Sequence, residues 1–231
     1  MNGFLDAQFW ISLLQIIGVN IVLSGDNAIV IAMAARSVPA HQQGRAIALG
    51  SMGAIVMRVI LTIFAVELLK LPYLKLVGSV LLFWIAVQLL LPEGDGEATF
   101  ESRDTLYAAI KTILIADLVM SLDNVIGVAA AAKGDLTLLI LGLGISIPLI
   151  VFGSSVVLKL MERFPVIIML GGALLGYIAG DMAVNDGAIS AWVAAKAGWL
   201  EPSAGIFAAL SVVGTGKWLA WRAQPEERRI I

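Results

Sequence analysis

Long apolar runs, separated by short polar or proline-containing segments, dominate the chain. A helix needs about 17–25 mostly apolar residues to cross the hydrocarbon core of a bilayer. The pattern predicts two longer connections, an acidic loop over 92–106 and a segment over 183–202 that we expect along the membrane surface. It also predicts seven transmembrane helices, at about 9–34, 45–67, 72–91, 108–132, 135–158, 164–182 and 203–221. The predicted fold class is an all-α membrane protein with a single transmembrane domain over 1–231.

Composition agrees with a membrane location and excludes several kinds of chemistry. Hydrophobic residues make up 60% of the 231 positions and charged residues only 14%, whereas soluble domains carry about 25% charge. A net charge of -2 argues against a nucleic-acid partner. The chain has no cysteine and one histidine, His41. Disulfides and thiolate sites are therefore excluded, and zinc, copper and nickel are disfavoured.

Basic residues indicate the orientation, because Lys and Arg accumulate on the cytoplasmic side. With the N-terminus outside, the outer segments hold four of them, Lys70, Lys75, Lys133 and Lys196. The inner segments hold ten: Arg36, Arg45, Arg103, Lys111, Lys159, Arg163, Lys217, Arg222, Arg228 and Arg229. The remaining one, Arg58, lies inside a predicted span. We therefore expect a multi-pass membrane protein with its N-terminus outside and its C-terminus in the cytoplasm.

An internal repeat is the most informative feature of the sequence. Residues 20–35 read NIVLSGDNAIVIAMAA, and residues 117–132 read DLVMSLDNVIGVAAAA. The alignment at an offset of 97 pairs Ser24 with Ser121, Asp26 with Asp123, and Asn27 with Asn124. A second stretch continues the match at an offset of 93, from Pro72 with Pro165 to Gln88 with Asp181.

The repeat predicts two copies of one three-helix unit. Helices 1–3 fall in the unit 8–91, helices 4–6 in the unit 107–182, and the region 183–231 adds a C-terminal loop and helix. Because each unit has an odd number of spans, the two copies must have opposite orientations in the membrane. Inverted repeats of this kind are typical of secondary transporters, whose binding site lies near the midplane where the units meet.

Four aspartates lie inside predicted spans, namely Asp26, Asp117, Asp123 and Asp181. Each would cost roughly 2.5–3.5 kcal/mol at the centre of a transmembrane helix. Either some of them are protonated or they share a bound cation, and both cases indicate ion or proton handling. Arg58 either pairs with one of these acids as a gate or extends to the outer interface.

Helical spacing places the motif side chains in two matching arrays. Asn20, Ser24 and Asn27 share one face of the first helix, and Asp117, Ser121 and Asn124 repeat this face in the second copy. Asp26 and Asp123 lie about 120° away from these faces in a regular helix. Gly25 offers a place for the helix to unwind, which would turn the carboxylate inward and free backbone carbonyls. Leu122 replaces this glycine in the second copy.

The ligand atoms on offer are carboxylate, amide, hydroxyl and carbonyl oxygens, which suit the hard divalent ions Mn²⁺, Ca²⁺ and Mg²⁺. Met33 and Met120 lie near the motifs, and a thioether ligand would favour Mn²⁺. The G-x-x-x-G-x-x-x-G run at Gly172, Gly176 and Gly180 should allow close packing on a motif helix, bringing Asp181 to the central cavity. We expect similar tight crossings at Gly50, Gly53, Gly142 and Gly144.

At the motifs SGDNAIVIA (24–32) and SLDNVIGVA (121–129), the chain resembles the TerC family of integral membrane proteins. It looks like the short YjbE-type members of this family, which are described as metal transport proteins, and the family is related to the LysE-like exporters. The resemblance covers helices 1–6 and extends to the seventh. It implies an exporter in which Asp26, Asn27, Asp123 and Asn124 are the motif positions, with Asp117 and Asp181 as further polar positions. Some family members are implicated in manganese efflux or in metal supply to exported enzymes.

The leading hypothesis is a secondary transporter that exports a divalent metal cation across a bacterial inner membrane, with Mn²⁺ favoured as substrate and no prosthetic group. Asp26, Asn27, Asp123, Asn124, Asp117 and Asp181 are the candidate ligands. Asn20, Ser24, Gly25, Ser121 and Arg58 belong to the pathway or the helix break. One alternative is a membrane scaffold that delivers metal to exported proteins. Another is an intramembrane aspartyl hydrolase with Asp26 and Asp123 as its dyad, although we expect no enzymatic activity. The glycine-rich faces would also allow a homodimer.

Overall fold

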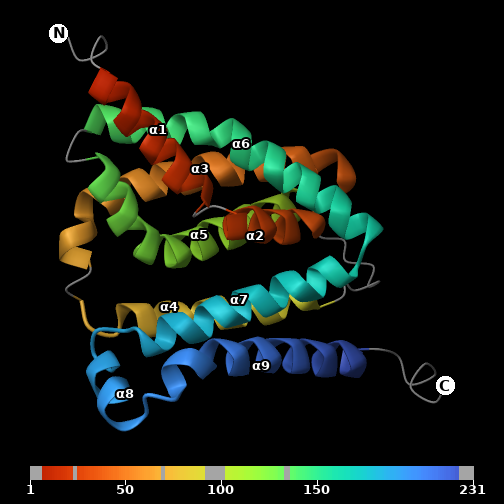
Figure 1. Ribbon diagram of the computed structural model, residues 1–231. Helices are drawn as coiled ribbons and strands as arrows, with labels where there is room; N and C mark the ends of the chain where they lie inside the picture. The colour runs from red at the N-terminus through yellow and green to blue at the C-terminus, as the bar shows by residue number, and fades with distance from the viewer. Residues whose placement is uncertain (1–6, 23–24, 69–70, 92–101, 133–135, 224–231) are drawn as a thin grey trace. The chain divides into compact units, whose positions relative to one another are not determined.

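The computed structural model describes residues 7–22, 25–68, 71–91, 102–132 and 136–223. Within these ranges all regular secondary structure is α-helical (Figure 1). The helices are α1 (Ala7–Val22), α2 (Gly25–Arg36), α3 (Ala40–Leu68), α4 (Leu74–Leu90), α5 (Ser102–Ala132), α6 (Leu136–Arg163), α7 (Val166–Val184), α8 (Ser190–Lys196) and α9 (Leu200–Ala223). The predicted all-α class is confirmed.

Among the described residues, four helices are long and apolar enough to cross a membrane, over 40–64, 137–163, 166–184 and 200–222. They correspond to the second, fifth, sixth and seventh predicted spans. The third predicted span matches the shorter apolar helix Leu74–Leu90. The chain is thus a multi-pass membrane protein, whereas its seven-span inverted repeat stays a prediction.

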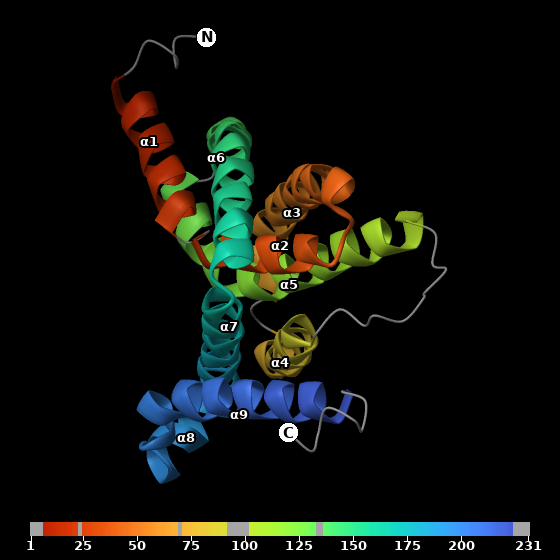
Figure 2. The same cartoon turned by 90° about the vertical axis from the view of Figure 1, so that its right-hand side faces the viewer.

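The first and fourth predicted spans differ from simple transmembrane helices. The first divides into α1 and α2, which lie on either side of residues 23–24 and run in different directions (Figure 2). The fourth falls on α5, which is continuous although its later, greener part turns away from its earlier part (Figure 1). Because α5 begins at Ser102, it also includes the end of the predicted acidic loop; residues 92–101 of that loop lie outside the described residues.

The described chain forms two compact units. Unit 1 comprises 1–71 and 102–159, and therefore holds α1, α2, α3, α5 and most of α6. Unit 2 comprises 72–101 and 160–231, and holds α4, α7, α8 and α9. Each unit thus combines helices from both predicted repeat copies, with the two motif-bearing segments together in unit 1.

In unit 1, α3 packs along α5, and α2 contacts both of them. The approach of α3 to α5 is close because a Cβ atom at Gly50 would lie 2.6 Å from Cδ1 of Ile113, and one at Gly53 would lie 2.8 Å from Cδ2 of Leu114. Gly142 of α6 likewise packs against Ile16 of α1. The predicted tight crossings are confirmed at these three glycines. The prediction is wrong for Gly144, where a Cβ atom would have open space.

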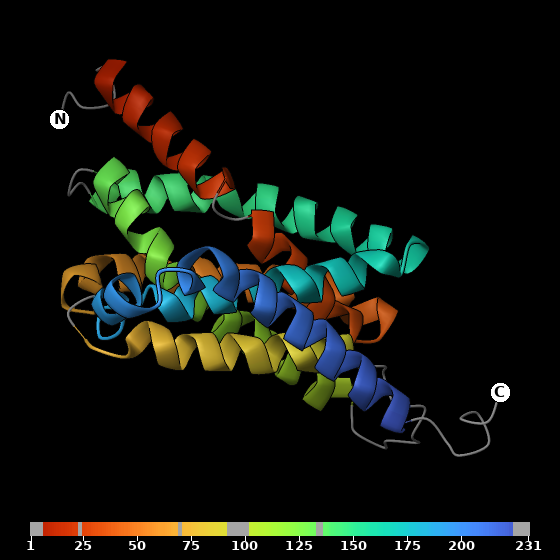
Figure 3. The same ribbon diagram turned by 60° about the horizontal axis from the view of Figure 1, so that its bottom comes forward.

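In unit 2, α7 packs against α4 and α9, and Figure 3 shows α9 crossing α7. A Cβ atom at Gly176 would lie 2.8 Å from Cα of Ala209, and one at Gly180 would meet the backbone of Ala204. A Cβ atom at Gly172 would instead meet a side chain of α4, because it would lie 2.6 Å from Cδ2 of Leu90. Gly176 and Gly180 therefore allow backbone contact with α9, whereas Gly172 packs on α4, and the predicted packing of the run on a motif helix is wrong.

Candidate functional site

The first motif begins a helix. Gly25 is the first residue of α2, and Asp26 follows it in the first turn. The carboxylate of Asp26 is half-buried and accepts a hydrogen bond from the backbone N–H of Asn27 at 2.8 Å. An acidic side chain is favoured here, because the N-terminal end of a helix carries a partial positive charge and unpaired N–H groups. The last carbonyls of α1 are the complementary feature, because they lack partners within their own helix.

Steric crowding does not require a glycine at the position of Gly25. A Cβ atom at this position would have nothing within 4 Å, and its φ lies outside the left-handed region that favours glycine. The predicted break is therefore supported by the boundaries of α1 and α2. Ser24 lies outside the described residues, and the Asn20 side chain does as well.

Asn27 is the most unusual polar group of unit 1. Its side chain is only 3% exposed, and neither its amide oxygen nor its amide nitrogen has a hydrogen-bond partner in the described part of the chain. Buried polar groups are normally paired, and leaving one unpaired costs about 1–3 kcal/mol. Ser51 of α3 and Ser154 of α6 are also buried hydroxyls whose oxygens find no partner among the described residues.

The helix segments that hold Asn27, Ser51 and Ser154 belong to the same unit. α2 and α3 form a helical hairpin through residues 37–39, so the level of Asn27 on α2 corresponds to about residue 49 on α3. A Cβ atom at Gly153 of α6 would lie 4.0 Å from Cβ of Ala28, which brings the turn that holds Ser154 next to the start of α2. The start of α2, with Asp26 and Asn27, therefore lies next to the turn of α6 that holds Ser154.

A buried ion pair joins α3 to α5 in the same unit. The guanidinium of Arg58 donates to Oδ1 of Asp117 at 2.5 Å and to Oγ of Ser121 at 3.0 Å. Ser121 in turn donates to Oδ2 of Asp117 at 3.2 Å. Arg58 is 1% exposed and Asp117 5% exposed. Of the two fates left open for Arg58, pairing with an aspartate is confirmed and extension to the interface is wrong, because the close packing of α3 on α5 encloses the guanidinium.

Asp26 belongs to the same electrostatic neighbourhood, because it interacts with both Arg58 and Asp117. The described part of unit 1 thus brings together two of the four predicted acids with the one intramembrane cation. Within that part, no group of three His, Asp or Glu side chains could hold a metal ion by itself. Any ion bound here would also need amide, hydroxyl or backbone oxygens.

The second motif is described only in part. Its Ser121 takes part in the ion-pair network, and the side chain of Asn124 is half-buried and engaged in an interaction. The Asp123 side chain lies outside the described residues, so its role as a ligand stays a prediction.

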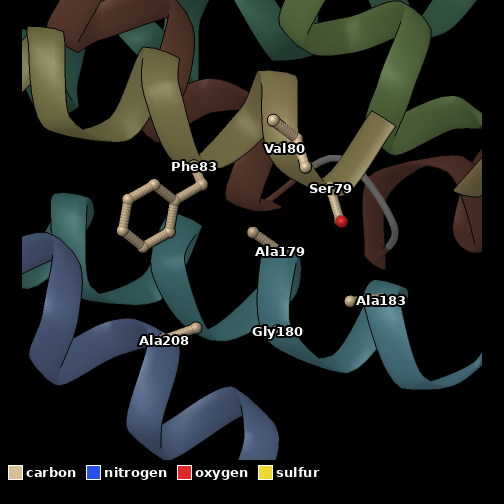
Figure 4. Close-up of a pocket in the computed structure, with 7 residues that line it drawn as sticks. All are labelled: Ser79, Val80, Phe83, Ala179, Gly180, Ala183 and Ala208. Carbon is tan, nitrogen blue, oxygen red and sulfur yellow. The ribbon is translucent and has the colours of Figure 1, made fainter. Parts of the chain in front are cut away.

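Asp181 lies in unit 2, near the end of α7, and its side chain is exposed. Asp26 and Asp117 belong to unit 1, and the role of Asp181 as a further ligand stays a prediction. A cavity of about 210 Å³ lies beside Gly180 (Figure 4). It has no charged lining residue, and the hydroxyl of Ser79 there already donates to the carbonyl of Leu76.

Sequence reasoning missed Asp186, which is buried just beyond α7. Its carboxylate accepts hydrogen bonds from the backbone N–H groups of Tyr73 at 3.2 Å, Leu76 at 3.1 Å and Ala188 at 2.8 Å. Burial by itself would raise the pKa of Asp186, but these backbone hydrogen bonds outweigh it and lower the pKa below its ordinary value. Asp186 therefore caps the start of α4 from a distant part of the chain.

The helices, the apolar spans and the buried ionic network define a multi-pass integral membrane protein with a polar site inside its helical core. More specifically, the chain belongs to the TerC family, because the family profile described as "Integral membrane protein TerC family" matches residues 5–224.

Similar proteins carry names that refer only to their membrane location. The chain is 43% identical to the membrane protein YjbE of Bacillus subtilis (strain 168) over 190 residues, which is 82% of this chain and 87% of that protein. It is 27% identical to the inner membrane protein YgdQ of Escherichia coli (strain K12) over 187 residues, 74% of this chain and 78% of that protein. No solved structure matches the chain.

Proposed function

We propose that the chain is a secondary transporter that exports a divalent metal cation, with Mn²⁺ as the first candidate. The division of the first predicted span into α1 and α2 at the S-G-D-N motif supports this proposal. Transporters commonly bind their substrates at interrupted helices, where a helix C-terminus offers carbonyl oxygens to cations. The TerC relationship agrees with a transporter-type membrane protein.

The observation that carries the proposal is the pair formed by Asp26 and Asn27 at the start of α2. Asp26 offers a half-buried carboxylate, while Asn27 offers a buried amide oxygen that has no partner in the described chain. A hard cation would coordinate the carboxylate and use the unpaired amide oxygen, which offsets the cost of burying it. Asp123 and Asn124 are proposed to supply the matching pair from α5.

Oxygen ligands, both charged carboxylates and neutral amides, favour Mn²⁺, Ca²⁺ and Mg²⁺ over softer metals. Met33 on α2 and Met120 on α5 are both buried in unit 1, and a thioether nearby would favour Mn²⁺ within this group. The sequence has no P-loop motif, so we propose that an ion gradient drives uphill export.

Flux of Mn²⁺ through the purified protein in sealed liposomes tests the proposal. The double variant Asp26→Asn with Asp123→Asn should reduce flux by at least about 100-fold, because losing two charged ligands costs more than about 2.7 kcal/mol. Glu162→Gln, which changes an exposed carboxylate on α6, is the matched control and should transport like the parent protein. Undiminished flux in the double variant would refute the site. Metal binding without flux in the parent would instead favour a metal-delivery scaffold.

A further inference from the structure

We propose that Arg58 is a tethered cation that occupies the Asp117 carboxylate while the metal site is empty and is displaced when a divalent cation binds. This inference rests on the proposed transport function and adds a mechanism for the empty state. It starts from the fact that one guanidinium and two carboxylates, those of Asp26 and Asp117, share an electrostatic neighbourhood in the core of unit 1.

The guanidinium of Arg58 brings one positive charge to this group, and the carboxylates of Asp26 and Asp117 bring two negative charges. Arg58 forms its ion pair with Asp117, and this pair is almost wholly shielded from solvent. The Asp26 carboxylate interacts with the same guanidinium and accepts a hydrogen bond from the backbone N–H of Asn27. In this arrangement the Arg58 guanidinium neutralises Asp117, which a bound divalent cation would otherwise do. Both acids become available to a cation only if the guanidinium moves away.

The contacts of Arg58 connect it to the second motif. Its Nε donates to Ser121, which is the first residue of the S-x-D-N element on α5, and Asp117 lies one helical turn earlier. A divalent cation held by this motif would repel the guanidinium at close range, because the core of a membrane protein screens charge poorly. Metal binding and the Arg58–Asp117 pair therefore compete.

The pair of Arg58 and Asp117 has no charged equivalent at the matching positions of the internal repeat. At the positions that match Asp117 and Arg58, the other copy has Asn20 and Val151, and this second pair has no charge. Only one half of the pseudo-symmetric site thus carries a cation of its own. An empty carrier with this tether keeps the Asp117 carboxylate paired, whereas a carrier without it would leave that carboxylate buried and unpaired.

A permanent structural ion pair is the competing explanation, and metal affinity separates the two. Under the proposal, Arg58→Gln frees Asp117 and should tighten Mn²⁺ binding, while Asp117→Asn leaves an unpaired cation and should weaken it. The shift in each direction should be about 5- to 150-fold, the usual range of coupling between two sites. A structural pair predicts weaker binding in both variants, because each of them breaks the same contact.

The experiment measures the Mn²⁺ dissociation constant of the full-length protein in lipid nanodiscs by calorimetry, together with Mn²⁺ flux in liposomes. Opposite shifts in the two variants, with parent-like affinity in the double variant Arg58→Gln and Asp117→Asn, are the expected result. Arg58→Gln should also slow flux because the metal is released less readily. Arg45→Gln, an exposed arginine on the same helix, controls for loss of a positive charge and should leave affinity unchanged.

Weaker binding in both single variants, or no change in either, would overturn the inference while leaving the proposed function in place. Failure of the parent protein to bind and transport Mn²⁺ would overturn the proposed function and this inference with it. If Arg58→Gln does not fold, the Mn²⁺ affinity of Arg58→Lys distinguishes the proposal from a structural ion pair. It keeps the charge but cannot make both bonds, so the proposal expects a smaller increase in affinity and a structural role expects a decrease.

Discussion

At Asp186 a single carboxylate accepts hydrogen bonds from the backbone of Tyr73, Leu76 and Ala188. Tyr73 precedes α4 with a left-handed φ of 64° and makes no side-chain cap of its own. The first N–H groups of α4 would therefore lack partners without the distant acid. The stability of α4 thus depends on a residue that follows α7.

Asp186→Asn should lower the free energy of unfolding by about 0.5–2 kcal/mol at neutral pH, the usual cost of losing a helix cap. Because the pKa of Asp186 is lowered in the folded protein, its contribution is present above the unfolded value near 3.8 and is lost as the pH falls through the folded value. Thermal unfolding in detergent between pH 7 and pH 3 (about the range of the titration) measures the difference. The difference in stability between the parent protein and the variant should become smaller below about pH 4. A difference that does not depend on pH would contradict the role of the Asp186 charge.

The sequence identified some site residues and not others, for reasons that depend on where their partners lie. Asp26 and Asn27 could be found because the repeat marks them twice. The partner of Arg58 could not be chosen, because it depends on how closely α3 packs on α5. Asp186 could not be found because its partners are backbone groups more than a hundred residues earlier, and no spacing pattern records such a contact.

At the scale of helices, the contact between α7 and α9 depends on the absence of side chains at Gly176 and Gly180. The Cβ atom of an alanine at Gly176 would lie 2.8 Å from Cα of Ala209 and 2.9 Å from the carbonyl oxygen of Ala208. Backbone atoms cannot rotate away as a flexible side chain can, so the whole helix would have to move.

Gly176→Ala should destabilise the protein by about 1–3 kcal/mol, the usual cost of overpacking. Gly214→Ala on α9 is the matched control, because a Cβ atom there would meet nothing within 4 Å. It should be neutral or slightly stabilising, since alanine favours helix. Thermal unfolding in detergent compares the two, and equal effects would show that the close contact does not limit stability.

The glycine run could be recognised in the sequence as a close-packing face, but its partner could not. Spacing describes one helix and says nothing about its neighbour, and α9 stands outside both repeat copies. Similarly, the apolar pattern predicted a continuous first span. The division into α1 and α2 was indicated only by Gly25 beside Asp26, and a glycine within a helix often leaves the helix intact.

At the scale of the whole molecule, the absence of cysteine from the sequence makes topology directly measurable. Ala40, at the start of α3, and Ala195, in α8, are both exposed, and the distribution of basic residues predicts them on opposite sides of the membrane. In intact cells, a membrane-impermeant maleimide should label Ala195→Cys but not Ala40→Cys. Lysis should make Ala40→Cys reactive. The reverse pattern would invert the proposed orientation and, with it, the direction of export.

The cap of α4 by Asp186 has a consequence for biosynthesis. Chains are made and inserted from the N-terminus onward, so α4 enters the membrane about a hundred residues before its cap exists. Unit 2 is also interrupted in the sequence by residues 102–159, which belong to unit 1. The first N–H groups of α4 must therefore lack this partner until the ribosome has made most of the protein. Truncated chains that end before residue 186 will lack this cap however completely their earlier helices have been inserted.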